Sequence, residues 1–139
     1  MAISDDLQAE AARHPFALRY TLTHDLFHVL LGFDTSYGGE AGVAAFTIAQ
    51  GYSGILSAMR PVMTWLYPLI FPAQAQQIRA NMGLGAAIGQ QAACVLAYPF
   101  EQNWARPIAE VRAELGLVLA NERLEPEAMD LVALTASCS

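Results

Sequence analysis

The sequence predicts an all-α fold, a single compact helical domain with an apolar groove between its helices. Three observations carry this prediction. A chain of 139 residues suits one domain with its own hydrophobic core. No stretch shows the alternation of a half-buried strand, and no Asn-Gly or Asp-Gly hairpin turn is present. Hydrophobic residues make up 55% of the chain and charged residues only 14%, which leaves more apolar surface than a small core needs.

Charge is distributed unevenly along the chain. Residues 41–100 contain no acidic residue and two bases, Arg60 and Arg79, whereas all thirteen carboxylates lie in the flanks. Such a middle segment predicts helices that line a lipid-binding groove or contact a membrane surface. The two arginines could meet an anionic head group, or serve as rim or salt-bridge residues. A net charge of −6 without any lysine argues against a nucleic-acid ligand, because phosphate backbones are met by clustered Lys and Arg.

The first helix is predicted over residues 15–31. Its apolar side chains follow helical spacing, Pro15 suits a first helical position, and Gly32 lies just past the end. A loop of turn-forming residues, 32–39, follows. The next helix is predicted over about residues 40–59, despite three glycines within it.

Prolines and glycines organise the next part of the chain. Pro61, Pro68 and Pro72 predict a bent apolar connector of short helical pieces, because proline lacks an amide donor and restrains the residue before it. Helix returns over about residues 73–96. In that helix Gly85 and Gly89 predict the close approach of another helix, and Cys94 near its end is predicted to be a core thiol.

The C-terminal part predicts two short helices. An amphipathic helix over residues 106–115 is ended by Gly116, and a last helix covers 126–134. The apolar runs 41–59 and 80–100 approach the length of a membrane span, but their Gln and Asn residues, many Ala and Gly residues and a mean hydropathy of +0.32 argue against insertion. The acidic N-terminus shows no signal or transit pattern. We therefore expect a cytoplasmic protein, peripheral to the inner face of the membrane, and the richness in Ala and Arg indicates a bacterial source.

A cluster of potential metal ligands stands out in the first third of the chain. His24 and His28 lie four residues apart, so their rings project from one face of the predicted helix. Asp25 borders that face, and a glycine pair lets the chain fold back to bring Glu40 to the same ion. We predict that these four residues bind a divalent metal, most readily Zn²⁺, then Fe²⁺, Mn²⁺ or Mg²⁺.

Other interpretations of this spacing stay open. The pattern also fits an ordinary hydrogen-bonded surface, and either carboxylate could orient a histidine instead of binding the ion. The HDxxH string is superficially similar to the HExxH of zinc proteases. No third ligand at a protease-like downstream position is evident, which disfavours a protease.

The string THDLFHVLLGFDTSYGGE, residues 23–40, contains the spacing HDxxH-x11-E. It resembles the signature of the Coq4 family of coenzyme Q (ubiquinone) biosynthesis proteins, and residues 104–117, WARPIAEVRAELGL, are similar to that family's closing helix. Family members usually carry further helices before the motif. Residues 1–139 therefore resemble a short form, a single helical domain without those helices.

The resemblance implies a Zn²⁺ or similar ion on His24, Asp25, His28 and Glu40, and a polyprenyl lipid or prenylated quinone precursor in the groove. It implies metal-dependent decarboxylation, a carbon–carbon lyase reaction, at C1 of a polyprenylated hydroxybenzoate, with no catalytic residue assigned. One alternative is a non-catalytic prenyl-lipid-binding or scaffold protein that organises other quinone-biosynthesis enzymes. Another is a hydrolase of phosphorylated isoprenoids. A homodimer is an open possibility.

Overall fold

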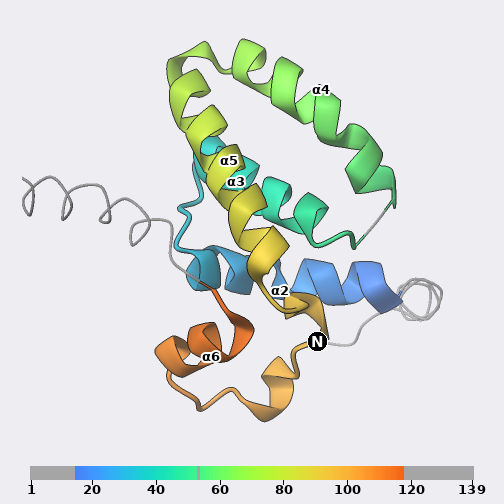
Figure 1. Cartoon of the computed structure of the whole chain (residues 1–139), viewed down its shortest axis with the longest axis vertical. Helices are drawn as coiled ribbons and strands as arrows, with labels where there is room; N and C mark the ends of the chain where they lie inside the picture. Colours follow the sequence, from blue (N-terminus) through green and yellow to red (C-terminus); the bar gives the residue numbers. More distant parts are fainter. Residues whose placement is uncertain (1–14, 53, 118–139) are drawn as a thin grey trace, which may run out of the picture.

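The computed structural model describes residues 15–52 and 54–117, and this part contains helices and turns but no strand (Figure 1). The predicted all-α class is confirmed. Five α-helices and three single turns of 3-10 helix follow one another: α2 (Pro15–Leu31), α3 (Tyr37–Ala49), α4 (Gly54–Ile70), η1 (Pro72–Gln74), α5 (Ala75–Gln91), η2 (Val95–Ala97), η3 (Phe100–Gln102) and α6 (Ile108–Leu115).

The hydrophobic core lies between α2, α3, the end of α5, the segment that leads into α6, and α6 itself. Phe27 of α2 and Phe46 of α3 are fully buried at its centre, with their rings in edge contact at 5.8 Å between centroids. No described side chain of α4 belongs to this core cluster. Its buried members are Phe27, Leu30, Leu31, Phe33, Val43, Phe46, Ile88, Val95, Leu96, Tyr98, Phe100, Val111, Leu115 and Leu117.

Hydrogen bonds of two arginines also hold α2, one from a residue of α2 itself and one from a residue of α6. Arg19 donates from Nε to the Leu96 carbonyl at 2.6 Å and from Nη2 to the Tyr98 carbonyl at 2.5 Å. Arg112 of α6 donates from Nε to the Leu30 carbonyl at 3.0 Å. Because the last carbonyls of a helix lack partners within that helix, the Arg112 contact stabilises the end of α2. The helix that carries the two histidines is thus fixed along its length.

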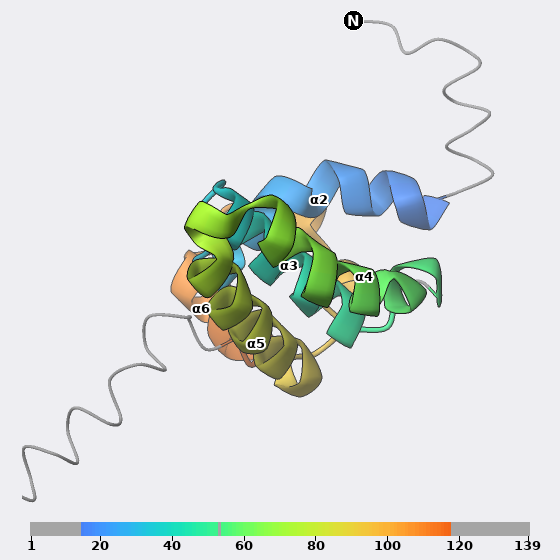
Figure 2. The same ribbon diagram turned by 90° about the horizontal axis from the view of Figure 1, so that it is seen from above.

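Helices α3 and α5 cross in close contact (Figures 1 and 2). A Cβ atom on Gly85 would lie 2.1 Å from the carbonyl oxygen of Gly42, and one on Gly89 would lie 2.7 Å from that of Phe46. These glycines therefore let the two backbones approach closely. The predicted helix approach at Gly85 and Gly89 is confirmed.

The predicted extent of the second helix is wrong, because α3 ends at Ala49 rather than near residue 59. Gly51 follows with φ of +69°, a left-handed conformation that turns the chain. The Gln50 side chain fixes this turn, since its Nε2 donates to the Gly89 carbonyl at 2.6 Å. A long-range contact with α5, invisible to local sequence patterns, therefore decides where α3 stops.

The predicted bent connector is also wrong, because α4 runs as one helix from Gly54 to Ile70, through Pro61 and Pro68. Each proline removes one backbone hydrogen bond, but α4 is exposed along most of its length, so water can take the freed carbonyls. No helix of the described residues is long and apolar enough to cross a bilayer. The exposed large apolar side chains of α4 are Ile55, Met59, Val62, Trp65, Leu66, Leu69 and Ile70.

The remaining predictions hold in part. Helix α5 ends at Gln91, before the predicted end near residue 96, and α6 ends as predicted at Gly116, which adopts φ of +68°. Cys94 is exposed, so its interpretation as a core thiol is wrong. The helix predicted over residues 126–134 lies outside the described residues.

Candidate metal centre

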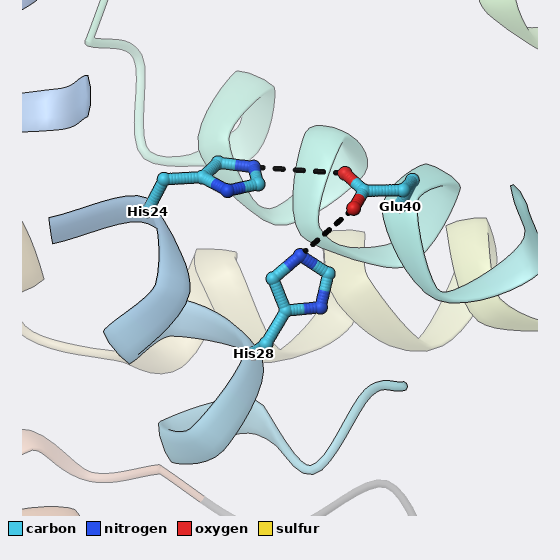
Figure 3. Close-up of side chains that lie close together, drawn as sticks. All are labelled: His24, His28 and Glu40. Carbon is cyan, nitrogen blue, oxygen red and sulfur yellow. Dashed lines mark ion pairs between the residues drawn. The ribbon is translucent and has the colours of Figure 1, made fainter. Parts of the chain in front are cut away.

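Three of the four predicted ligands converge between α2 and α3 (Figure 3). The Nε2 atom of His28 lies 3.2 Å from Oε1 of Glu40, and Nε2 of His24 lies 3.6 Å from Oε2 of the same carboxylate. One ligand atom from each residue lies within 4.8 Å of the others. The structure thus brings His24, His28 and Glu40 to one point.

The two histidines are placed by α2 as their spacing predicts. They sit one turn apart, with ring centroids 5.0 Å from each other. The His24 ring also contacts the edge of the Tyr20 ring, one turn earlier, at 5.6 Å between centroids. The His28 side chain is 7% exposed, against 28% for His24 and 41% for Glu40. The centre is therefore open to solvent on the side of His24 and Glu40.

Glu40 is placed by a capped helix start. Ser36 is the N-cap of α3, and its Oγ accepts from the Gly39 amide at 3.1 Å. The same hydroxyl donates to Oδ1 of Asp34 at 2.5 Å, and the Ser36 amide donates to that oxygen at 3.1 Å. These hydrogen bonds lower the pKa of Asp34, the side-chain bond most of all. A charged Asp34 thus helps to hold the turn from which Glu40 projects.

The close approach of the backbone of Asp34 requires glycine at position 39. A Cβ atom at Gly39 would lie 1.8 Å from the backbone oxygen of Asp34, a contact that only a backbone shift can relieve. The neighbouring Gly38 differs, because the nearest atom to its Cβ would be the Cγ of Gln77, at 2.7 Å on a flexible side chain.

We expect Gly39→Ala to destabilise the protein by about 1–3 kcal/mol, the usual cost of overpacking, and to weaken metal binding by displacing Glu40. Gly38→Ala is the matched control and should have a much smaller effect on both. Thermal unfolding and metal content of the two purified variants test this expectation. Equal behaviour of the two variants would contradict it.

The hydrogen bonding of His28 fits a bound cation. Its Nδ1 lies 3.0 Å from the carbonyl oxygen of Asp34 and 3.3 Å from that of Phe33. A carbonyl accepts only, so Nδ1 carries the proton, and in the neutral ring Nε2 presents a lone pair. That atom is buried without a hydrogen-bond partner among the described residues, and it faces Glu40. A divalent ion between the two would satisfy both.

The donor set also suits zinc. Two histidines and one glutamate form the protein ligands of one class of catalytic zinc site, in which a fourth position stays open for water or substrate. The contact of His28 Nδ1 with a backbone carbonyl is the usual way in which a metal-bound imidazole is oriented. The residues present therefore fit Zn²⁺.

Asp25 lies apart from the three converging residues. Its side chain is fully exposed, and its Oδ1 lies 3.8 Å from Nδ1 of His24. This position suits a residue that orients the His24 ring. Direct ligation by Asp25 stays a prediction.

An aromatic cluster beside Glu40 was not assigned to the site from the sequence. Phe71 stacks on Tyr37 at 3.9 Å between ring centroids, and Tyr67 meets both rings edge-on. Burial, and then the charge of Glu40, raise the pKa of the Tyr67 phenol. The end of α4 thus reaches the first turn of α3. Its aromatic residues gave no local signal, because they are also typical of plain core.

Residues 13–121 match the family model described as "Coenzyme Q (ubiquinone) biosynthesis protein Coq4". The mitochondrial ubiquinone biosynthesis protein COQ4 homologue of Rattus norvegicus is 34% identical over 101 residues, which cover 71% of this chain and 37% of the rat protein. The Danio rerio homologue is 36% identical over 101 residues, covering 71% of this chain and 36% of its own.

A crystal structure shows the same likeness. It is of a protein from Nostoc punctiforme that is described as belonging to ubiquinone biosynthesis, with a TM-score of 0.64 and 26% sequence identity over 84% of this chain and 54% of that one. The chain spans less than half the length of the rat and zebrafish relatives. The family match covers most of the chain, including His24, His28, Glu40 and α6. The chain therefore belongs to the Coq4 family of coenzyme Q (ubiquinone) biosynthesis proteins.

Proposed function

We propose that this protein acts in coenzyme Q biosynthesis by metal-dependent C1 decarboxylation of a polyprenylated hydroxybenzoate intermediate. Membership of the Coq4 family supports the pathway. The observation that carries the chemistry is the convergence of His24, His28 and Glu40 on one point, with their ligand atoms within 4.8 Å of one another.

In this proposal His24, His28 and Glu40 hold a divalent ion, Zn²⁺ by the donor set. When bound, such an ion supplies a Lewis acid that stabilises negative charge on a carboxylate or phenolate oxygen. The Asp34 carbonyl keeps the His28 ring turned toward the centre. The side chain of Glu40 is 41% exposed, and the ring of the substrate would approach the centre from this open side.

The reaction replaces the carboxylate on C1 of the ring with a proton. A ring with a hydroxyl group para to the carboxylate takes a proton at C1. The bond from C1 to the carboxylate carbon then breaks, CO₂ leaves, and the electron pair of that bond restores the aromatic ring. Because Glu40 is a metal ligand in this proposal, the exposed carboxylate of Asp25 is the acidic group left beside the histidines, and an acid in hydrogen-bond reach of the reacting carbon can move this proton.

The apolar surface supports a polyprenyl substrate and contact with a membrane. Helix α4 exposes Trp65, Leu69 and Ile55 by 81%, 75% and 78%. Burial of an isoprenoid tail contributes about 0.8 kcal/mol for each methylene-sized group. The tail can therefore supply binding energy while the metal centre positions the head.

Turnover with and without metal tests the proposal. We expect the purified chain to convert a polyprenylated 4-hydroxybenzoate to the decarboxylated phenol, to lose this activity on chelation and to regain it with Zn²⁺. Glu40→Gln should be inactive although it is folded. A metal-free protein with full activity would refute the proposal.

The second candidate is a non-catalytic prenyl-lipid-binding or scaffold protein that organises other quinone-biosynthesis enzymes. The observation that favours it is the exposed apolar surface of α4, which none of the described core residues covers. It predicts a co-purified isoprenoid, a metal that merely orders the loop, and no turnover. Native mass spectrometry reports ion, lipid and oligomeric state, including a homodimer, in one measurement.

A further inference from the structure

Tyr67 of α4 reaches the candidate metal centre from a helix that carries none of the predicted ligands. Its ring meets the rings of Phe71 and Tyr37 edge-on, at 5.1 and 6.5 Å between centroids. Tyr37 begins α3 three residues before Glu40, so these two side chains share one face of that helix. Burial raises the pKa of Tyr67, and the charge of Glu40 adds to this shift. The Tyr67 phenol therefore lies within electrostatic reach of the centre.

The corner that follows α4 fixes the position of this phenol. Phe71, the residue after α4, stacks on Tyr37 at 3.9 Å between centroids, with the ring planes 20° apart. Gln74 accepts a hydrogen bond from the Gly38 amide at 3.3 Å. These contacts tie the end of an otherwise exposed helix to the first turn of α3. A phenylalanine at position 67 could keep the ring contacts and would lack the hydroxyl group alone.

The hydroxyl group of Tyr67 is available to a ligand. The hydroxyl groups of Tyr20, Tyr52 and Tyr98 bond to neighbouring side chains, at 3.4, 2.9 and 3.0 Å. Tyr37 is 49% exposed to solvent. The partly buried Tyr67 has no hydrogen-bond partner within residues 15–52 and 54–117. Its two ring contacts nevertheless restrict its position, so a placed donor remains beside the metal centre.

The charge of the centre indicates which group this donor meets. Of the three converging residues Glu40 alone is anionic, because histidine binds a metal in its neutral form. A divalent ion on these residues would leave an excess of positive charge that a further anion can neutralise. A carboxylic acid supplies such an anion at neutral pH, whereas a phenol keeps its proton and can donate it in a hydrogen bond. Hydrogen bonds from a hydroxyl group to a carboxylate are short and strong.

We propose that Tyr67 is a specificity-determining residue of the metal centre, whose hydroxyl group donates a hydrogen bond to the carboxylate of the bound aromatic acid. Tyr37 and Phe71 hold the Tyr67 ring in place for this contact. The contact selects an acid over a neutral ring of the same shape. The inference rests on the proposed function, because it takes an aromatic acid as the ligand of the centre.

Calorimetric titration of the zinc-loaded full chain with 3-geranyl-4-hydroxybenzoate tests this inference. We expect Tyr67→Phe to bind this acid about tenfold or more weakly, because it loses a hydrogen bond to a charged group. Its metal content and unfolding temperature should equal those of the parent chain. In 2-geranyl-4-methylphenol a methyl group replaces the carboxylate, and this analogue should bind both proteins equally.

Tyr98→Phe is the matched control. It removes a hydroxyl group that accepts from Arg106, in a cleft that no candidate metal ligand lines, so it should bind the acid as the parent does. Where turnover is measured, Tyr67→Phe should raise KM with little change in kcat, because its hydrogen bond is made to the carboxylate before CO₂ leaves.

The outcomes separate this inference from the proposed function. If the parent chain binds and decarboxylates the acid, and Tyr67→Phe does so with the same affinity and KM, the inference fails and the proposed function stands. A metal-loaded parent chain that neither binds nor converts the acid would overturn both. A Tyr67→Phe protein that loses its ion, or that binds the methyl analogue as poorly as the acid, would assign Tyr67 to the packing of α4 and so overturn the inference.

Discussion

Replacement of His28 by alanine is expected to reduce the metal content of the purified chain from about one ion to a trace, because it removes the most buried ligand of a three-residue site. Loss of a residue that merely orients a ligand already costs about 10–100-fold in metal affinity, so the loss of a direct ligand should cost more. Metal analysis by mass spectrometry after dialysis against buffer with a weak chelator measures this effect.

Two further variants separate metal loss from unfolding. Glu40→Gln keeps the shape of the side chain and removes its charge, so we expect the same loss of metal and the unfolding temperature of the metal-free parent chain. Asp25→Asn alters an exposed group outside the three converging residues, and it should retain the ion with at most the effect of an orienting residue. A folded His28→Ala protein that keeps a full complement of metal would rule out the proposed centre.

Gly85→Ala is expected to destabilise the protein strongly. The new Cβ would lie 2.1 Å from the carbonyl oxygen and 2.9 Å from the carbonyl carbon of Gly42, so α3 and α5 would have to separate. Overpacking of this kind costs about 1–3 kcal/mol and occasionally more. The cost should exceed the gain of about 1 kcal/mol that alanine brings to a helix relative to glycine. Urea unfolding measures the difference.

Gly83→Ala is the matched control in the same helix. Nothing lies within 4 Å of a Cβ atom at Gly83, so alanine there should raise the free energy of unfolding by about 0.5–1 kcal/mol. Opposite signs for the two variants are expected. Equal stabilisation by both would mean that the backbones of α3 and α5 are not in close contact at Gly85.

Helices with local start and stop signals could be predicted from the sequence. Pro15 and Gly32 bound the first helix, and Gly116 ends α6 because it adopts a left-handed conformation. Such signals act within a few residues, so no knowledge of the fold is needed to use them. The close packing at Gly85 and Gly89 was predictable for a related reason, since two glycines four residues apart leave one helix face without side chains.

The boundary between α3 and α4 depends on contacts that sequence patterns do not contain. Gln50 donates to the Gly89 carbonyl and also accepts from the Val95 amide at 3.3 Å. These partners lie about forty residues away in the chain. The prolines of α4 predicted breaks, but α4 continues through Pro61 and Pro68. The carbonyls that they leave unpaired lie on an exposed helix, where water can accept this role as hydrogen-bond partner.

Some features of the candidate site could likewise be predicted from local sequence patterns, and others depend on how the helices pack. The helical spacing of His24 and His28 and the glycines before Glu40 predicted that these three residues meet. The outward position of Asp25 and the contact of His28 with the Asp34 carbonyl depend on how α3 and the loop pack against α2. The turn formed by Asp34 and Ser36 had a usable signal, since Asp and Ser before a helix often bond to nearby backbone amides.

The first turn of α3 contributes to the candidate metal centre and also contacts the corner between α4 and α5. It carries Glu40, and it is also tied to the corner between α4 and α5, where Phe71 stacks on Tyr37 and Gln74 accepts from the Gly38 amide at 3.3 Å. An ion that binds the ordered turn but not a disordered one adds its binding free energy to the stability of that order. Metal binding and the packing of α4 against the first turn of α3 are therefore thermodynamically linked. The bound ion should raise the protection of the α4 amides against hydrogen exchange, and the packing of α4 should strengthen metal binding.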